Sequence, residues 1–141
     1  MQTDADPALA VRELHALFQS WFRGEGPPDA MARFERSLDP ALRMVIPAGE
    51  VLERGPLLEL LQNNEAQRAA DHVVSTRAEV TVQRGTFGDG IEWALVLYEE
   101  WAGPADAMRG RQSSVLLKAD PQAVAGWRWL HVHETWLSEA P

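Results

Sequence analysis

The second half of the chain is a series of long strand patterns separated by short turns. The patterns run over residues 72–83, 91–101, 108–118 and 127–137, with Gly, Pro and Asp residues between them. Apolar and polar side chains that alternate at a period of two are typical of half-buried strands. Long strands joined by short turns pair with their neighbours in antiparallel fashion. The sequence therefore predicts a meandering antiparallel sheet.

Helical patterns dominate the first half of the chain. Apolar residues recur at spacings of three and four over residues 7–23, which predicts an amphipathic helix. A second helix is expected over residues 29–36 and a third over residues 55–64, with a short strand over residues 42–46 between them. Because helices that precede a sheet must cover its apolar face, the predicted class is α+β. A length of 141 residues predicts a single domain, residues 1–141.

Composition excludes several kinds of partner and chemistry. The formal net charge of −8 repels phosphate backbones and anionic lipid surfaces, so neither nucleic acid nor a membrane is an expected partner. The chain contains no cysteine, which rules out disulfides and thiolate chemistry and suits a reducing compartment. The first residues lack the pattern of a secretory signal, and no apolar run is long enough to cross a bilayer. The expected location is the cytoplasm.

The last two strand patterns contain a specific motif. It consists of Arg109, Gln112, Ser113, Trp129, Leu130, Val132 and His133. The motif resembles the paired final strands of the nuclear-transport-factor-2-like superfamily, and within it the SnoaL-like small bacterial proteins and the association (hub) domain of calcium/calmodulin-dependent protein kinase II. Residues 42–50 resemble the first strand and hairpin of that superfamily. The resemblance implies a cone-like α+β barrel, in which N-terminal helices pack against a curved antiparallel sheet, with a pocket between the helices and the inner sheet face.

The resemblance also assigns the faces of the last three strands. The side chains that it turns toward the pocket are Trp93, Leu95, Leu97, Glu99, Trp101, Arg109, Arg111, Ser113, Val115, Leu117, Arg128, Leu130, Val132, Glu134 and Trp136. A β-bulge would reverse this facing. The side chains that it would then bring inward are Tyr98, Glu100, Gln112, Ser114, His131 and His133.

Under the first facing, Glu99 and Glu134 are buried acids close to Arg111. Burial raises the pKa of a carboxyl group, which suits a general acid or base near neutral pH. Alternatively, Arg111 pairs with one of the acids, and the ion pair joins neighbouring strands. Tyr98 is a further candidate, because its hydroxyl can polarise a carbonyl group.

His131 and His133 lie two residues apart on the last strand, so both imidazoles project from one face. This spacing can offer two ligands to zinc. A third ligand would have to come from His72, Glu99 or Glu100, and no pattern places one of these beside the two histidines. We therefore expect no bound metal and no cofactor.

Partners and function follow from the pocket and from the surface of the last strand. The expected partner is a second copy of the chain, because Trp127, Trp129, His131 and His133 share the outer side of that strand. The positions that match the pocket arginines of the kinase hub hold Leu97, Leu117 and Trp136, so the anion-binding chemistry of the hub is not carried over.

The predicted function is the binding of a small apolar or amphipathic ligand. The expected binding residues are Glu99, Trp101, Arg111, Ser113, Glu134, Tyr98 and His131. One alternative is a cofactor-independent isomerase, dehydratase or hydrolase that uses Glu99, Glu134 or His133 as its general base. Another alternative is a dimeric assembly module. Fold alone does not decide among these functions.

Overall fold

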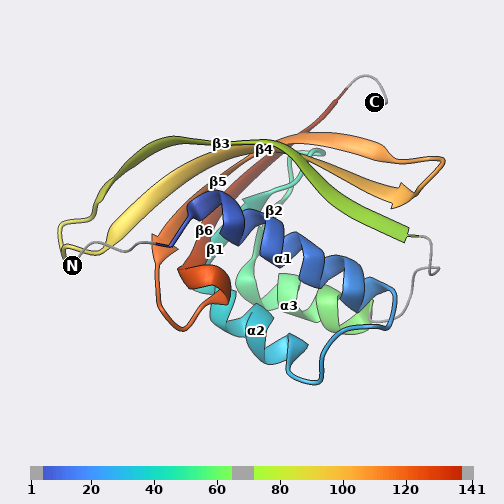
Figure 1. The fold of residues 1–141 in the computed structure, drawn as a ribbon, viewed down its shortest axis with the longest axis horizontal. Helices are drawn as coiled ribbons and strands as arrows, with labels where there is room; N and C mark the ends of the chain where they lie inside the picture. The colour runs from blue at the N-terminus through green and yellow to red at the C-terminus, as the bar shows by residue number, and fades with distance from the viewer. Residues whose placement is uncertain (1–4, 65–71, 138–141) are drawn as a thin grey trace.

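The computed structural model describes residues 5–64 and 72–137 (Figure 1). Its elements, in chain order, are α1 (Pro7–Phe22), α2 (Ala30–Ser37), β1 (Leu38–Val45), β2 (Val51–Glu53), α3 (Arg54–Asn63), β3 (His72–Thr86), β4 (Glu92–Pro104), β5 (Arg109–Ala119), the short 3-10 helix η1 (Val124–Gly126) and β6 (Trp127–Trp136). In the described ranges, no helix is both long enough and apolar enough to span a membrane.

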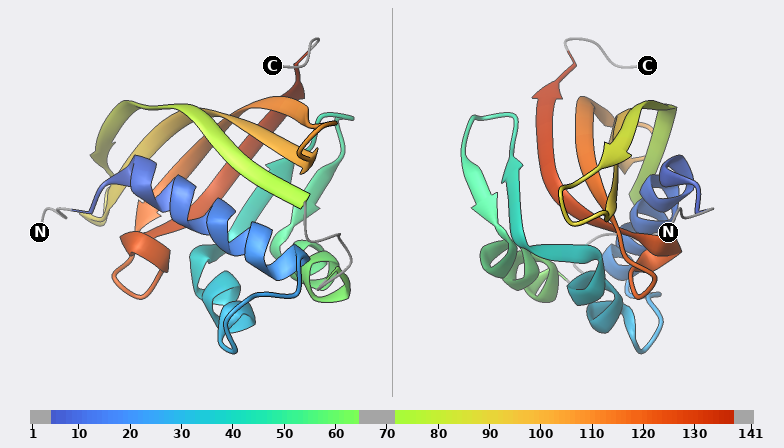
Figure 2. Two further views of the ribbon diagram at one scale, coloured as in Figure 1. Left: turned by 45° about the vertical axis from the view of Figure 1, so that its right-hand side comes forward. Right: turned by 90° about the vertical axis from the view of Figure 1, so that its left-hand side faces the viewer.

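The strands form one curved sheet in the order β2-β1-β6-β5-β4-β3. The three helices pack against its concave side, as the views in Figure 2 show. The predicted α+β class is therefore confirmed, with two corrections. The sheet is unclosed, because β2 and β3 lie at opposite edges and do not pair. It is also mixed rather than antiparallel, because β1 runs parallel to β6.

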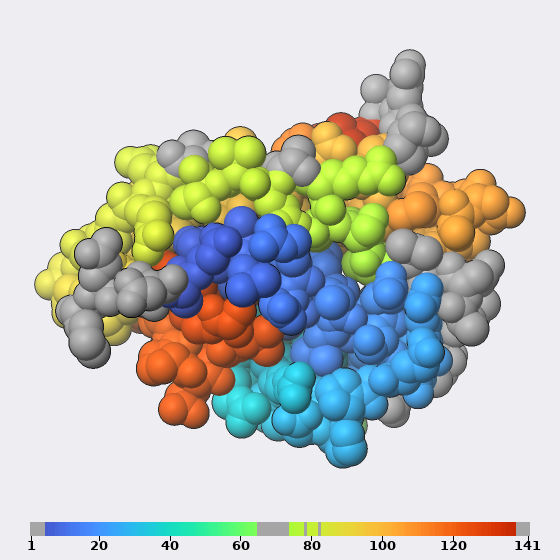
Figure 3. Space-filling model, in the orientation of Figure 1, coloured from blue at the N-terminus to red at the C-terminus, as the bar shows by residue number. Residues whose placement is uncertain are grey.

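The helix α1 packs against the sheet and contacts the helix α3. It begins at Pro7, where the Asp6 carboxylate accepts a hydrogen bond from the Ala8 amide at 3.0 Å. Near its other end, the Trp21 indole donates a hydrogen bond to the Leu61 carbonyl of α3 at 2.6 Å. In Figure 3, α1 (blue) lies along the open side of the sheet, below the green strand β3. The apolar stripe of α1 thus covers the concave face.

The facing expected for β4 was wrong by one residue. Tyr98 lies opposite Ser113, and Glu100 lies opposite Arg111. Residues directly opposite in an antiparallel pair point to the same face. Since Arg111 faces the concave side as expected, Tyr98 and Glu100 face it too, and Glu99 faces outward.

Trp101 also lies on the outer side of the sheet, although it is buried. Its ring covers Gly110, the residue opposite it on β5. A Cβ atom added at Gly110 would lie 2.5 Å from that ring. The indole is therefore buried by contacts on the outer face, and it does not line the pocket on the concave side.

The strand β6 contains a bulge that changes its facing halfway along. Leu116 lies opposite His131, but the next residue of β5, Leu117, lies opposite Trp129. Leu130 is therefore an extra residue, and the side chains before it turn to the other face.

Consequently, the two tryptophans that were expected on the outer face, Trp127 and Trp129, are buried in the core. Arg128, which was expected to face the pocket, instead forms ion pairs with Asp39 at 3.1 Å and Asp120 at 3.3 Å. Beyond the bulge, Glu134 points inward as expected.

Candidate functional site

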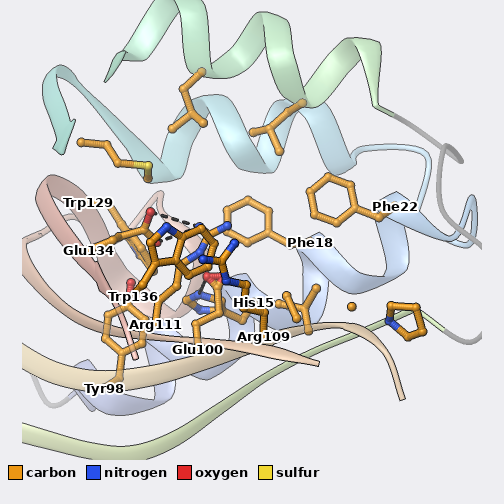
Figure 4. Close-up of a pocket in the computed structure, with 17 residues that line it drawn as sticks. His15, Phe18, Phe22, Tyr98, Glu100, Arg109, Arg111, Trp129, Glu134 and Trp136 are labelled. Carbon is orange, nitrogen blue, oxygen red and sulfur yellow. Dashed lines mark hydrogen bonds and ion pairs between the residues drawn. The ribbon is translucent and has the colours of Figure 1, made fainter. Parts of the chain in front are cut away.

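A pocket of about 650 Å³ lies between the helices and the concave face of the sheet. Most of its wall is apolar, and its titratable groups gather on one side, whereas Phe22 lies on the other (Figure 4). The lining residues are His15, Phe18, Phe22, Met44, Leu57, Leu61, Val74, Tyr98, Glu100, Ala102, Gly103, Pro104, Arg109, Arg111, Trp129, Glu134 and Trp136.

Cross-strand pairing places the polar groups of the pocket in two rows. Tyr98, Ser113 and Glu134 form one row across β4, β5 and β6. Glu100, Arg111 and Trp136 form the next row. Side chains in neighbouring rows on one face are close enough for long residues to meet diagonally. The sheet thus brings two acids, one arginine and a phenol into one cluster.

The helix α1 adds His15 to this cluster. Its ring is buried, with Nδ1 2.8 Å from the Val11 carbonyl oxygen and Nε2 3.6 Å from Oε1 of Glu100. A carbonyl oxygen can only accept, so Nδ1 must carry a hydrogen and donate it. If Glu100 is ionised, Nε2 must carry a second proton to donate to its carboxylate, and His15 is then an imidazolium.

Burial and charge oppose each other in this pair. Burial alone would lower the pKa of His15, but its contact with the Glu100 carboxylate outweighs burial and raises that pKa. Burial alone would raise the pKa of Glu100, and the contact with His15 together with the charge of Arg111 lowers it. The raised pKa of His15 and the lowered pKa of Glu100 both favour an imidazolium paired with a carboxylate. His15 is therefore the group of this pair that can donate a proton.

Glu134 has a different partner. One terminal nitrogen of Arg111 lies 3.1 Å and 3.3 Å from its two carboxylate oxygens. Burial, followed by the negative charge of Glu100, nevertheless raises the pKa of Glu134. The side chain of Glu134 is almost completely buried, whereas that of Arg111 is partly exposed. The two ion pairs thus lie side by side in one wall of the pocket.

Tyr98 contacts the ring of His15 and lies in the same cross-strand row as Glu134. Its ring contacts the rings of His15 at 5.2 Å and Trp129 at 6.2 Å between centroids. Burial, together with the charges of Glu100 and Glu134, raises the pKa of Tyr98 well above its usual value. Its hydroxyl therefore stays protonated and can donate a hydrogen bond.

At the end of β6, two arginines lie against one indole. The guanidinium carbon of Arg109 is 3.5 Å from the ring centroid of Trp136, and that of Arg111 is 4.9 Å from it. Such contacts between a cation and an aromatic face are attractive and restrict the side chains. Trp136 therefore positions both arginines beside the pocket.

The structure brings some of the predicted site residues together and separates others. Arg111, Glu134 and Tyr98 line the pocket, and Ser113 is buried in the row between Tyr98 and Glu134. Glu99 and Trp101, which were expected to line it, lie on the outer face, where the Trp101 indole donates to Glu99 at 3.0 Å.

His131 and His133 are exposed on the outer face as well. Within residues 5–64 and 72–137, no group of three or more His, Asp or Glu side chains is arranged to hold a metal ion.

Sequence reasoning missed His15. It turned Arg109 toward the pocket without naming it as a binding residue, and it placed Glu100 there only under the reversed facing. A signal for His15 existed, because it follows Val11 by four residues on the buried stripe of α1. A titratable residue on such a stripe needs a partner from the opposing sheet. No comparable signal identified Glu100, since the choice between adjacent glutamates depended on the facing of β4.

Comparisons with known proteins agree with this architecture. No protein-family model matches the chain, and no curated protein matches it. Among solved structures, an NTF2-like protein of unknown function from Pseudomonas aeruginosa is 26% identical, over 89% of this chain and 93% of that chain, with a TM-score of 0.74.

Two further structures have other described roles. The CaMKII hub from S. rosetta is 20% identical, over 96% of this chain and 100% of that chain, with a TM-score of 0.64. A ketosteroid isomerase-like protein from Parabacteroides distasonis is 12% identical, over 89% and 83% of the two chains, with a TM-score of 0.58. The chain therefore has the NTF2-like fold, which is shared by proteins of different function.

Proposed function

We propose that the protein binds a small molecule in the pocket between its helices and the concave sheet face. The observation that carries the proposal is the pair formed by His15 and Glu100, which lies beside about 650 Å³ of open volume. A buried ion pair is weak support for stability, because desolvation offsets most of its attraction. A pair that only held α1 on the sheet would need no open volume beside it. Apolar pockets of this size with a few convergent polar groups are typical ligand sites.

Saturable binding of a fluorescent apolar probe tests this proposal. N-phenyl-1-naphthylamine becomes bright in apolar surroundings, and we expect one molecule to bind per chain. Ala102 lines the pocket, so Ala102→Trp should fill it and abolish binding, whereas Ala105→Trp, in an exposed turn, should not. Binding that is absent from the parent protein, or that persists in a correctly folded Ala102→Trp variant, would contradict the proposal.

A second candidate function is cofactor-independent proton transfer. It is favoured by the proton that His15 and Glu100 share beside the open volume. The isomerase-like relative supports the same candidate through fold alone. Exchange of deuterium from solvent into the α-carbon of cyclic ketones, followed by NMR, is the test. Loss of exchange in both His15→Gln and Glu100→Gln would support a catalytic role for the pair.

We also propose that two copies of the chain pair through the outer face of the sheet. Trp127 and Trp129 no longer support this idea, because the bulge turns them inward. Support comes instead from Val80 and Leu97, which lie opposite each other on β3 and β4 and are 56% and 38% exposed. The hub relative supports the proposal through its fold as well. The open pocket argues against a role in assembly alone.

A further inference from the structure

We infer that the pocket selects ligands in which a single negatively charged group is attached to an apolar body. This inference rests on the proposed binding function and adds the chemical class of the ligand. It follows from the number, pairing and position of the charged groups that line the pocket.

The two ion pairs of the pocket are each neutral when both of their partners are charged. His15 and Glu100 together hold one shared proton, because Nδ1 of His15 is already committed to the Val11 carbonyl. Glu134, where ionised, is balanced by Arg111 at 3.1 Å. Neither pair therefore leaves a negative charge for a cationic ligand to bind.

Arg109 is the remaining charged residue of the lining, and it is exposed to solvent. Among the residues that the structure describes, no carboxylate forms an ion pair with it. Its guanidinium group lies 3.5 Å from the ring centroid of Trp136, so it is held in place with hydrogen-bond donors to spare. The pocket thus has one excess positive charge in a chain whose formal net charge is −8.

The pocket has a charged part and an apolar part. The charged side chains lie together in Figure 4, and Phe22 lies away from them across the pocket. The helices α1 and α3 and the strands β1 and β3 contribute six apolar side chains to the lining, namely Phe18, Phe22, Met44, Leu57, Leu61 and Val74. A ligand that matches both parts has an anionic end near Arg109 and an apolar body against these side chains. Guanidinium groups bind carboxylates through two parallel hydrogen bonds, so a carboxylate suits this end.

Competition between matched ligands tests the inference. N-phenyl-1-naphthylamine serves as the reporter, and 2-naphthoate and 2-naphthamide, which share an apolar body and differ in charge, serve as competitors. We expect naphthoate to bind roughly tenfold more tightly than naphthamide at low salt, because a charge-assisted hydrogen bond is stronger than a neutral one. Decanoate and decanamide form a second matched pair, which shows whether the apolar body is aromatic or aliphatic.

Variants test whether Arg109 causes the preference for naphthoate over naphthamide. Arg109→Gln should bring the ratio of the naphthamide and naphthoate dissociation constants close to one, and Arg109→Lys should keep most of the preference. Lys118→Gln is the matched control, because Lys118 is a cation of the same strand that lies outside the pocket lining, against Phe87.

Equal binding of both competitors to the parent protein would overturn the inference and leave the proposed function intact. A preference that persists in Arg109→Gln would overturn the assignment to Arg109. Failure of the reporter itself to bind would overturn the proposed function.

Discussion

The Nε2 atom of His15 lies 3.6 Å from Oε1 of Glu100, across the boundary between α1 and the concave face of β4. Because Nδ1 of the same ring donates to the Val11 carbonyl, the imidazole can satisfy both partners only as the cation. Helix packing and the charge state of the pocket are therefore coupled through one side chain. The coupling has a measurable dependence on pH.

Replacing His15 by Gln should destabilise the protein in a pH-dependent way. The raised pKa of His15 means that its contribution is complete below about pH 6.5 and is lost as the pH rises through the raised value. The lowered pKa of Glu100 means that its contribution is present above about pH 4.5 and is lost as the pH falls through the lowered value. Between these limits, His15→Gln should lower the free energy of unfolding by on the order of 3 kcal/mol.

Urea unfolding at several pH values between about 5 and 9 measures this effect. The difference between the parent protein and His15→Gln should shrink toward the alkaline end. His133→Gln, at an exposed position, should show almost no difference at any pH. A difference that is constant over the whole range would mean that His15 contributes through packing rather than charge.

Replacing Glu134 by Gln should increase the affinity of the pocket for an anion. The substitution preserves the shape of the side chain and leaves Arg111 without its carboxylate partner. Displacement of the fluorescent probe by 2-naphthoate should then require about fivefold less competitor at low salt. Glu99→Gln is a matched control on the outer face and should change nothing. Equal effects of the two substitutions would argue against the assigned facing of β4.

The choice between Glu99 and Glu100 illustrates which parts of the site could be predicted. The order of helices and strands follows from local periodicity, and the motif on the last two strands led to the correct fold. The facing of β4 depends on how its residues align with those of β5. An alignment that is wrong by one residue assigns every side chain of the strand to the opposite face. Glu134 and Arg111 were placed correctly because no bulge separates them.

The bulge at Leu130 had no clear signature in the sequence. Both facings of Trp129 satisfy an apolar pattern, because an indole suits a core as well as an interface. The distinction is made by tertiary packing, in which Trp129 meets Tyr98 and His15 from other elements. The short strand β2 was implied only by the resemblance of residues 42–50 to a strand and hairpin, since its three residues are too few to show a period.

Adding a methyl group at Gly110 should destabilise the sheet. A Cβ atom there would lie 2.5 Å from the ring of Trp101, and the buried indole has little space to move. Gly110→Ala should therefore lower the free energy of unfolding by about 2 kcal/mol, as overpacking commonly does. Gly55→Ala is the control, because no atom lies within 4 Å of a Cβ atom there and alanine favours the helix α3. Thermal unfolding measures both variants, and an unchanged midpoint for Gly110→Ala would contradict the packing described for Trp101.

A charge on the outer face of the sheet should weaken self-association. Leu97 is 38% exposed in one chain, and it lies beside the more exposed Val80, so a second copy that covers both would bury an apolar surface. Leu97→Glu would place an unpaired carboxylate in that contact, and the dimer should weaken at least tenfold, because a buried charge without a partner is strongly unfavourable. Leu60→Glu is the matched control, since Leu60 is also exposed but lies on α3. Sedimentation at micromolar concentration should give a dimer for the parent protein and Leu60→Glu, and a monomer for Leu97→Glu. A monomeric parent protein, or equal dissociation of both variants, would exclude this face as the interface.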